Sequence, residues 1–292
     1  MEGSDMQFIK SLNNNAALVS DDNKYEYVVI GTGLGFGYHS GDLINMDRIQ
    51  RRFKADIKNK DSEIETLNFI RPDALAATER IAHEVETKLN LQFSRYQYLA
   101  LADHMDLTLK RLEQAIYLPD TTMGWAIRKL YNKEYELALY VIKTLNQNDV
   151  LSVKLPDSEA SSLVLHFVNA ESKQDQVQDT VEITKLIAGV IQIVQLDFQE
   201  TLDSKSFNYS RFITHLRGFM VNKMSKEDEI ETEQELDPSF LNLMQAKYPE
   251  AYMTVQRIAL YLKQQRNWQL SNNEQVYLTL HVWRVTHRQT TK

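Results

Sequence analysis

Cysteine is absent from this sequence of 292 residues, and glycine, proline and long apolar runs are scarce. Without cysteine, disulfides, thiol nucleophiles and cysteine-based zinc sites are excluded. No apolar run approaches the roughly 20 residues that span a bilayer. The chain opens with acidic and polar residues, unlike the basic and then apolar start of a secretion signal. We therefore expect a cytoplasmic protein.

The glycines are concentrated in one segment, and the net charge of the chain is negative. Only nine glycines occur, and five of them stand in one stretch, "VVIGTGLGFGYHSGD", residues 28–42. The formal net charge is −7 at pH 7, which opposes non-specific nucleic-acid binding, because that binding is driven by phosphate neutralisation. Residues 1–55 carry six basic and seven acidic side chains. Charge alone therefore indicates no nucleic-acid-binding segment.

The composition changes near residue 55. Before it, short apolar segments alternate with turn residues such as "NNN" and "DDNK", which predicts a small antiparallel β-meander with a hairpin at residues 21–24. After residue 60, apolar residues recur at helical spacing in "ALAATERIAHEVETKL", "YQYLALADHMDLTLKRLEQ" and "DTVEITKLIAGVIQIVQLDF". The polar "FKADIKNKDSEIE" between the two parts fits a linker or the start of the first helix.

The helical part contains a duplication. The residues around His104 resemble those around His215, 111 positions later, and the residues around His166 resemble those around His281, 115 positions later. A glutamate stands seven residues before the second histidine of each copy. Solenoid units are only about 20–50 residues long, so a repeat of this length indicates two helical domains of ordinary size.

These patterns together predict the domain organisation. The glutamate of the second copy, Glu274, follows Ser271 at the spacing of a helix capping box. The fold class that we expect is multidomain, with a small all-β antiparallel domain followed by two homologous all-α helical-bundle domains. The expected ranges are 1–55 for the β domain, 56–64 for a linker, and 65–170 and 171–292 for the two helical domains.

The glycine stretch does not fit a nucleotide-binding loop. A dinucleotide fingerprint has glycine at its first, third and sixth positions and then a helix, but the sixth position here is Phe36 or Tyr38. The Gly-Lys-Ser/Thr of a P-loop is absent as well. Glycine instead occupies every second position from 31 to 37, which in an extended chain would place Thr32, Leu34 and Phe36 on one face. Two readings stay open: a bulged strand with a close neighbour, or a flat surface for a ligand.

The order of features resembles that of the BglG/SacY-type transcriptional antiterminators. "IKSLNNNAALV", the glycine stretch and the basic "RIQRRF" are similar to the RNA-binding domain of that family, and the histidine-bearing copies are similar to its paired phosphotransferase-regulation domains. The resemblance covers essentially the whole chain. It implies a homodimer that binds a hairpin in the leader of a sugar-utilisation messenger RNA and thereby excludes an overlapping terminator.

The resemblance also implies the control of this activity. Histidines of the first helical domain would be phosphorylated by the sugar-specific permease of the phosphotransferase system, usually with an inhibitory effect. Those of the second would be phosphorylated by its phosphocarrier protein, usually with an activating effect. The matching phosphorylation sites are His104, His166, His215 and His281. No cofactor, metal or catalytic residue is expected.

The RNA contacts implied by the resemblance lie in two short segments. A phenylalanine can stack on a splayed-out base, and asparagine or backbone groups can read base edges. Thr32 departs from the family pattern, in which a lysine or arginine is common. The implied contacts are Lys10, Asn15, Gly31, Thr32, Gly33 and Phe36, with Asn13 and Asn14 beside them.

One difference between the two copies suggests how their responses diverge. Asp103 directly precedes His104, whereas Thr214 directly precedes His215. An aspartate in this place could orient the imidazole or repel a phosphoryl group, and threonine could not repel it. We hypothesise that this difference contributes to opposite responses of the two helical domains.

Two other classes of function compete with this reading. A DNA-binding activator with the same regulatory domains would carry a helix-turn-helix ahead of them, whereas residues 1–55 read as strands. A histidine-based metal enzyme would need ligand spacing of the HExxH kind, which the sequence lacks. The sequence therefore favours the interpretation of this protein as an antiterminator.

Overall fold

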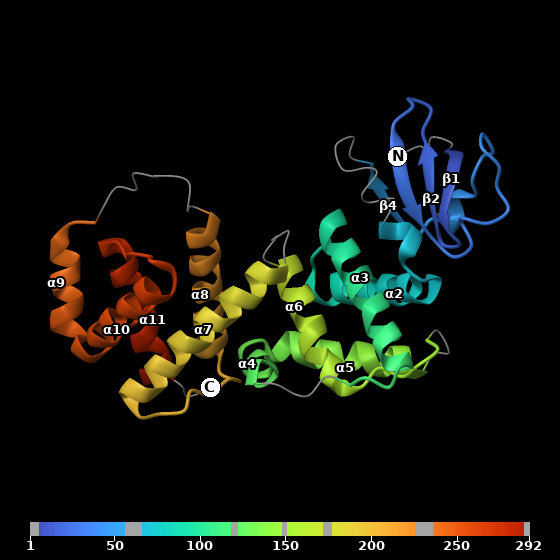
Figure 1. Ribbon diagram of the computed structural model, residues 1–292. Coiled ribbons are helices and arrows are strands. Elements are labelled where there is room, and N and C mark those ends of the chain that lie inside the picture. The colour runs from blue at the N-terminus through green and yellow to red at the C-terminus, as the bar shows by residue number, and fades with distance from the viewer. Residues whose placement is uncertain are drawn as a thin grey trace. The chain divides into compact units, whose positions relative to one another are not determined.

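The computed structural model describes residues 6–55, 66–117, 122–147, 151–171, 177–225 and 236–288. A four-stranded antiparallel sheet comes first and helices follow it (Figure 1), which confirms the expected fold class. The chain forms two compact units, one made of Met1–Asp120 and Lys133–Val177 and the other of Thr121–Asn132 and Gln178–Lys292. The expected linker, residues 56–64, lies outside the described residues.

The sheet is the predicted β-meander. Its strands follow one another in the order β1 (Gln7–Asn13), β2 (Ala16–Ser20), β3 (Glu26–Ile30) and β4 (Arg51–Lys54), and every neighbouring pair is antiparallel. The hairpin at residues 21–24 is confirmed, because the Lys24 N–H donates to the Asp21 carbonyl at 2.9 Å. Lys24 itself has a φ of 63°. The one helical element in residues 6–55 is the short 3-10 turn η1 (Met46–Arg48), so no helix-turn-helix lies there.

Both faces of this sheet are buried. One face forms a core of Met6, Phe8, Ala17, Val19, Val29, Leu34 and Ile44. On the other face Ala16, Leu18, Val28 and Ile30 are also buried. Phe53 pairs with Val28 on this second face, and its ring lies 5.4 Å from the ring of Tyr98, which belongs to a helix. The helical part of the first unit therefore helps to cover the sheet.

The first unit holds the helices of the first copy except α4 (Thr122–Leu130), which belongs to the second unit. Helix α3 (Arg95–Glu113) begins with a capping box between Ser94 and Gln97. Helix α2 (Pro72–Leu89) is followed by the cap residue Asn90, whose backbone is in the left-handed region, which asparagine tolerates. The apolar spacing of "ALAATERIAHEVETKL" and "YQYLALADHMDLTLKRLEQ" predicted α2 and α3 correctly. The elements are α2 (Pro72–Leu89), α3 (Arg95–Glu113), α5 (Asn132–Gln147), η2 (Asp157–Glu159) and α6 (Ala160–Glu171).

The second unit repeats the capping box and the left-handed asparagine cap. Helix α11 (Asn272–His287) begins with the predicted capping box between Ser271 and Glu274. Helix α10 (Pro249–Arg266) is followed by the cap residue Asn267, which is again left-handed. The stretch "DTVEITKLIAGVIQIVQLDF" lies in α7, as its spacing predicted. The helices are α4 (Thr122–Leu130), α7 (Val177–Phe198), α8 (Phe207–Ser225), α9 (Pro238–Lys247), α10 (Pro249–Arg266) and α11 (Asn272–His287).

Candidate functional site

The glycine stretch folds into consecutive turns, so the expectation of an extended strand is wrong. The Leu34 N–H donates to the Gly31 carbonyl at 3.1 Å, and the Phe36 N–H donates to the Gly33 carbonyl at 3.2 Å. Gly33 and Gly37 have φ values of +71° and +85°, which glycine adopts without steric cost. Alternate glycines therefore mark chain reversals here, not one face of a strand.

The turn between β1 and β2 forms hydrogen bonds with this loop. The N–H groups of Gly31 and Gly35 donate to the carbonyls of Asn15 and Asn14 at 2.8 and 3.1 Å. The Gly33 N–H donates to the side-chain oxygen of Asn15 at 3.0 Å. The segment "NNN" and the glycine stretch thus form one hydrogen-bonded unit.

Two glycines are required by close backbone approach. A Cβ added to Gly31 would lie 1.9 Å from the Arg48 carbonyl oxygen, and one added to Gly35 would lie 1.7 Å from the Asn13 carbonyl oxygen. Such distances cannot be relieved by rotating a side chain, because the atoms that clash belong to the backbone. The expectation of a close backbone neighbour was therefore correct, although the neighbours are the 3-10 turn η1 and the last residue of β1, and not a strand paired with the loop.

The side chains of the loop diverge. Leu34 is fully buried in the core of the sheet, whereas Thr32 and Phe36 are exposed, Phe36 by 77%. The expectation that all three share one face is therefore wrong, because a turn rotates successive side chains by angles other than the 180° of a strand. The result is an exposed aromatic ring on a loop that is anchored by its neighbour Leu34.

The remaining residues of the expected RNA surface fall into two groups. Lys10 and Asn14 are exposed. Asn13 and Asn15 instead bind the start of the helical part. The Asn13 amide donates to the Leu67 carbonyl at 2.7 Å, and the Asn15 amide donates to the Pro72 carbonyl at 3.1 Å. In this arrangement the two amides hold the loop to the helices.

The two candidate histidines of the first copy form a pair that the sequence comparison did not reveal. His104 on α3 and His166 on α6 have ring centroids 4.9 Å apart. Burial lowers the pKa of both imidazoles, that of His166 to well below its usual value. Among the residues that the structure describes, none forms a hydrogen bond with the buried Nε2 of His104. Both rings are therefore neutral near pH 7.

A buried ion pair accompanies this first pair. Glu159 is only 2% exposed and accepts a hydrogen bond from Arg111 at 2.8 Å. After burial, which lowers the pKa of His104, the Glu159 charge raises it and the Arg111 charge lowers it. Asp103 is exposed and has the smallest of these effects on the pKa of His104. The charged groups near His104 therefore include a carboxylate, that of Glu159, which is already paired with Arg111.

The second copy builds a tighter and more basic cluster. His215 on α8 and His281 on α11 have ring centroids 4.2 Å apart. The Tyr277 hydroxyl lies 2.5 Å from Nδ1 of His215, and Nε of Arg211 donates to its Nε2 at 3.3 Å. Burial lowers the pKa of His215 most, and the charges of Arg211 and Arg284 lower it further. Burial and these neighbours lower the pKa of His281 to about 4.

Comparison with known proteins decides the family. The chain matches the CAT RNA binding domain family over residues 6–62 and the PRD domain family twice, over residues 79–170 and 188–285. The chain belongs to the CAT–PRD antiterminator family. The expected RNA contacts fall within the CAT match, and one histidine pair falls within each PRD match.

Relatives named antiterminators are similar to this chain along nearly their whole length. Transcription antiterminator LicT of Bacillus subtilis is 28% identical over 284 residues, which cover 96% of this chain and 99% of LicT. The beta-glucoside operon antiterminator of Dickeya chrysanthemi is 27% identical, with 96% of each chain covered. The crystal structure of GlcT CAT-PRDI superposes with a TM-score of 0.50 and 25% identity, covering 57% of this chain and 98% of that one.

The two PRD copies share one further contact. The glutamate seven residues before the second histidine pairs with a basic residue on the helix of the first histidine: Glu159 with Arg111, and Glu274 with Lys223, each at 2.8 Å. The sequence analysis found the glutamates but not their partners.

Sequence reasoning also missed three residues around the second pair. Arg211 stands four positions before His215, Tyr277 stands four positions before His281, and Arg284 follows His281 by three positions. Residues three or four apart share a helix face, so these spacings were the available signal. Thr214, by contrast, donates to the Ser210 carbonyl at 2.9 Å and is exposed.

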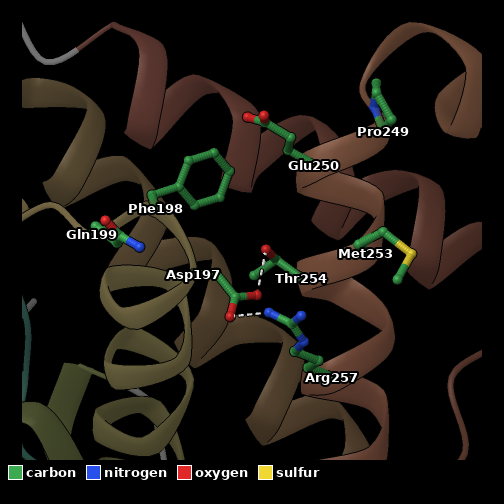
Figure 2. A pocket seen from close by; sticks show the side chains of 8 residues that line it. All are labelled: Asp197, Phe198, Gln199, Pro249, Glu250, Met253, Thr254 and Arg257. Atoms are coloured by element: carbon green, nitrogen blue, oxygen red, sulfur yellow. Dashed lines mark hydrogen bonds and ion pairs between the residues drawn. The ribbon is translucent and has the colours of Figure 1, made fainter.

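The second unit also has a pocket of about 460 Å³ between the end of α7 and the start of α10 (Figure 2). Its polar groups bond to one another: Thr254 donates to Asp197 at 2.7 Å, and Arg257 pairs with the same carboxylate. None of the four candidate histidines lines it. Its lining residues are Asp197, Phe198, Gln199, Pro249, Glu250, Met253, Thr254 and Arg257.

The described residues contain neither a metal-binding cluster nor a membrane-spanning helix. No group of three or more histidine, aspartate or glutamate side chains in them is arranged to hold a metal ion. Within the same ranges, no helix is long and apolar enough to cross a membrane.

Proposed function

We infer that this protein is a transcription antiterminator. It binds an RNA hairpin in the leader of a sugar-utilisation messenger RNA, prevents formation of an overlapping terminator, and is regulated through its PRD domains by the sugar phosphotransferase system. The observation that carries this inference is the CAT–PRD–PRD order along this chain, together with its similarity to relatives named antiterminators over nearly their whole length. A DNA-binding activator is not favoured, because residues 6–55 form a β-meander.

We propose that RNA binds at the glycine loop and the adjoining β1–β2 turn. The proposed contacts are Lys10, Asn13, Asn14, Asn15, Gly31, Thr32, Gly33 and Phe36. The exposed ring of Phe36 offers a stacking platform, and stacking on an aromatic ring contributes about 1–3 kcal/mol per base. Asn13 and Asn15 would contact RNA only after release of the carbonyls of residues 67–72.

A gel-shift titration tests this surface. Phe36→Ala is expected to weaken binding of the leader hairpin by about 1–3 kcal/mol, or roughly 5- to 150-fold in Kd. Phe207→Ala is the matched control, because Phe207 is a similarly exposed phenylalanine (72%) in the second unit. Equal affinities of the two variants would remove Phe36 from the RNA surface. A preference for duplex DNA over the hairpin would overturn the proposed function.

We propose that phosphorylation of His104, His166, His215 and His281 carries the regulation. A phosphoryl group adds about −1.5 to −2 charges. At the first pair this charge would be buried near the carboxylate of Glu159, and the nearby cation, Arg111, is already paired with that carboxylate. Phosphorylation is therefore expected to loosen the packing of α3 on α6. At the second pair it would face Arg211 and Arg284. These opposite surroundings support opposite effects of phosphorylation in the two domains.

The partners and the location of the protein follow as proposals from this function. The phosphoryl donors are the phosphocarrier protein and a sugar-specific permease, and the site of action is the cytoplasm, where nascent RNA is made. We propose no enzymatic activity and retain residues 1–55, 65–170 and 171–292 as the functional domains. A homodimer is physically reasonable, because a β domain of about 55 residues buries little surface alone. Sedimentation analysis of the full chain tests it.

A further inference from the structure

The β domain has few cations for a surface that is proposed to bind RNA. Residues 1–55 carry six basic and seven acidic side chains, so attraction of phosphates depends on where the basic groups lie and not on the net charge. Lysine and arginine side chains are prominent among the donors that bind phosphate oxygens. The six basic residues are Lys10, Lys24, Arg48, Arg51, Arg52 and Lys54.

The three cations of strand β4 are already engaged. Arg51 forms ion pairs with two glutamates of α2, and Arg52 and Lys54 lie over tyrosine rings at 5.2 and 3.9 Å. The strand also runs away from the glycine loop, because its first residue pairs with Ile30 and its last with Tyr27. None of these three charges is therefore well placed to serve the loop.

Lys24 lies at the opposite end of the sheet from the glycine loop. It belongs to the hairpin between β2 and β3, whereas the loop follows Ile30, which pairs with Ala16 at the other end of β2. The five residues of β2 span about 13 Å, which exceeds the Debye length of about 8–10 Å at physiological salt. The charge of Lys24 is thus largely screened from the loop.

Arg48 is the cation that lies against the glycine loop. It is the last residue of η1, and a Cβ added to Gly31 would lie 1.9 Å from its carbonyl oxygen, so the two backbones touch. The Gln50 N–H donates to the Ile30 carbonyl at 2.9 Å, which holds η1 beside the start of the loop. The Arg48 side chain is exposed, and no acidic side chain among the described residues forms an ion pair with it. Its guanidinium is therefore available to an anion that reaches the loop.

We propose that Arg48 binds a backbone phosphate of the RNA beside the glycine loop. This inference rests on the proposed RNA surface, to which it adds a residue. The Gly31 N–H donates to the Asn15 carbonyl at 2.8 Å, so Arg48, Gly31 and Asn15 follow one another along the same end of the sheet. Bonds from a guanidinium to phosphate are charge-assisted and frequently bidentate. They fix the position of the RNA and carry no sequence information.

A salt titration of RNA binding by the full chain tests this contact. The probe is the leader hairpin of the gel-shift titration, and its affinity is measured between about 50 and 200 mM salt. Arg48→Gln should weaken binding by about tenfold at the lower salt concentration. It should also reduce the slope of log K against log salt by about 0.7–0.9 for each bound chain. Lys24→Gln is the matched control, because it removes the same charge at the far end of the sheet and should change neither quantity.

Two further variants separate the charge of Arg48 from a structural role. The thermal midpoint of Arg48→Gln should equal that of the parent, because the side chain is exposed and unpaired. Arg48→Lys keeps the charge and should keep most of the salt slope. Thr32→Lys, added to Arg48→Gln, should restore part of the affinity and of the slope, because Thr32 is exposed and adjoins Gly31.

A scrambled hairpin of the same length shows whether Arg48 contacts phosphate or a base. A phosphate contact should weaken binding of the leader and scrambled hairpins by the same factor, and a loss confined to the leader hairpin would overturn the phosphate assignment. Equal affinities and slopes of Arg48→Gln and Lys24→Gln would overturn the inference while leaving the proposed function standing. A parent chain that binds both hairpins equally well would overturn the proposed function itself.

Discussion

Arg51 is the side chain whose removal should disturb the first unit most. It reaches from β4 to α2, where it donates to Glu79 at 2.8 and 3.2 Å and to Glu86 at 2.9 Å, and its guanidinium lies 4.8 Å from the centre of the Tyr98 ring. Its side chain is 13% exposed, and those of the two glutamates are 14% and 20% exposed. Arg51→Met keeps the apolar stem and leaves two carboxylates facing each other without a cation.

The magnitude follows from this burial. Breaking a buried ion pair by removing one partner costs about 3–5 kcal/mol, and the partial exposure here favours the lower end, about 3 kcal/mol. Burial raises the pKa of Glu86, but the hydrogen bonds from Arg51 and from the Phe93 N–H outweigh burial, so its pKa lies below 4.5. A carboxyl whose pKa is lowered on folding stabilises above its unfolded pKa and loses that contribution as the pH falls. The cost of Arg51→Met should therefore shrink below about pH 4.5.

Hydrogen exchange read by mass spectrometry is the suitable assay, because it resolves β4 and α2 separately. We expect amides of residues 51–54 to exchange on the order of 100-fold faster at pH 7 in Arg51→Met. All three tryptophans, Trp125, Trp268 and Trp283, lie in the second unit, so unfolding followed by their fluorescence should be unchanged.

The control for this variant is the next residue along the strand. Arg52 is exposed and stacks on Tyr27 at 5.2 Å, an arrangement worth about 0.5–1 kcal/mol. Arg51→Met with Glu79→Gln and Glu86→Gln should recover most of the protection. If Arg51→Met were no worse than Arg52→Met, the reasoning about the buried cation would be refuted.

Two further predictions concern the glycine loop and the second histidine pair. Gly35→Ala should destabilise the β domain by about 1–3 kcal/mol or more, since its Cβ would meet the Asn13 carbonyl. The Cβ of Gly33→Ala would meet no atom, so this variant should cost only about 1–2 kcal/mol for its left-handed backbone. Equal midpoints in the thermal unfolding of the two variants would contradict this prediction. The His281 ring, with its pKa at about 4, should show no titration between pH 5 and 8 in ¹H–¹³C spectra. The second unit should lose stability as the pH falls from about 6.5 toward 4, because the unfolded chain binds the proton first. A titration midpoint near 6.5 would show that the ring is not buried as described.

Much of the fold was predictable because local signals agreed with it. The turn residues at 21–24, the apolar spacing of α2, α3 and α7, and the Ser271–Glu274 capping box each act within a few residues, and the structure confirms each of them. The glycine stretch shows the limit of such reasoning. Alternation from 31 to 37 has the period of a strand, but it arises from turns whose φ values the sequence does not specify.

Contacts between distant helices were the part that the sequence could not supply. Comparing the copies related His104 to His215, yet the ring that packs on His104 is that of His166 in the same copy, 62 positions away. The partners of Arg51 are similarly remote, at Glu79 and Glu86. Arg211 could have been found from its spacing to His215. The Asp103–Thr214 difference stays a hypothesis, and the arginines near His215 now offer a stronger contrast between the domains.

Transcription in vitro tests the central claim most directly. The template carries the leader of a sugar-utilisation operon, with its hairpin overlapping a terminator, and the measurement is the ratio of read-through to terminated transcript. We expect the full chain to raise read-through on this template, with no effect once the hairpin sequence is scrambled, and Phe36→Ala to lose most of the effect. Unchanged termination with the intact leader, at protein concentrations that bind the hairpin, would contradict the account.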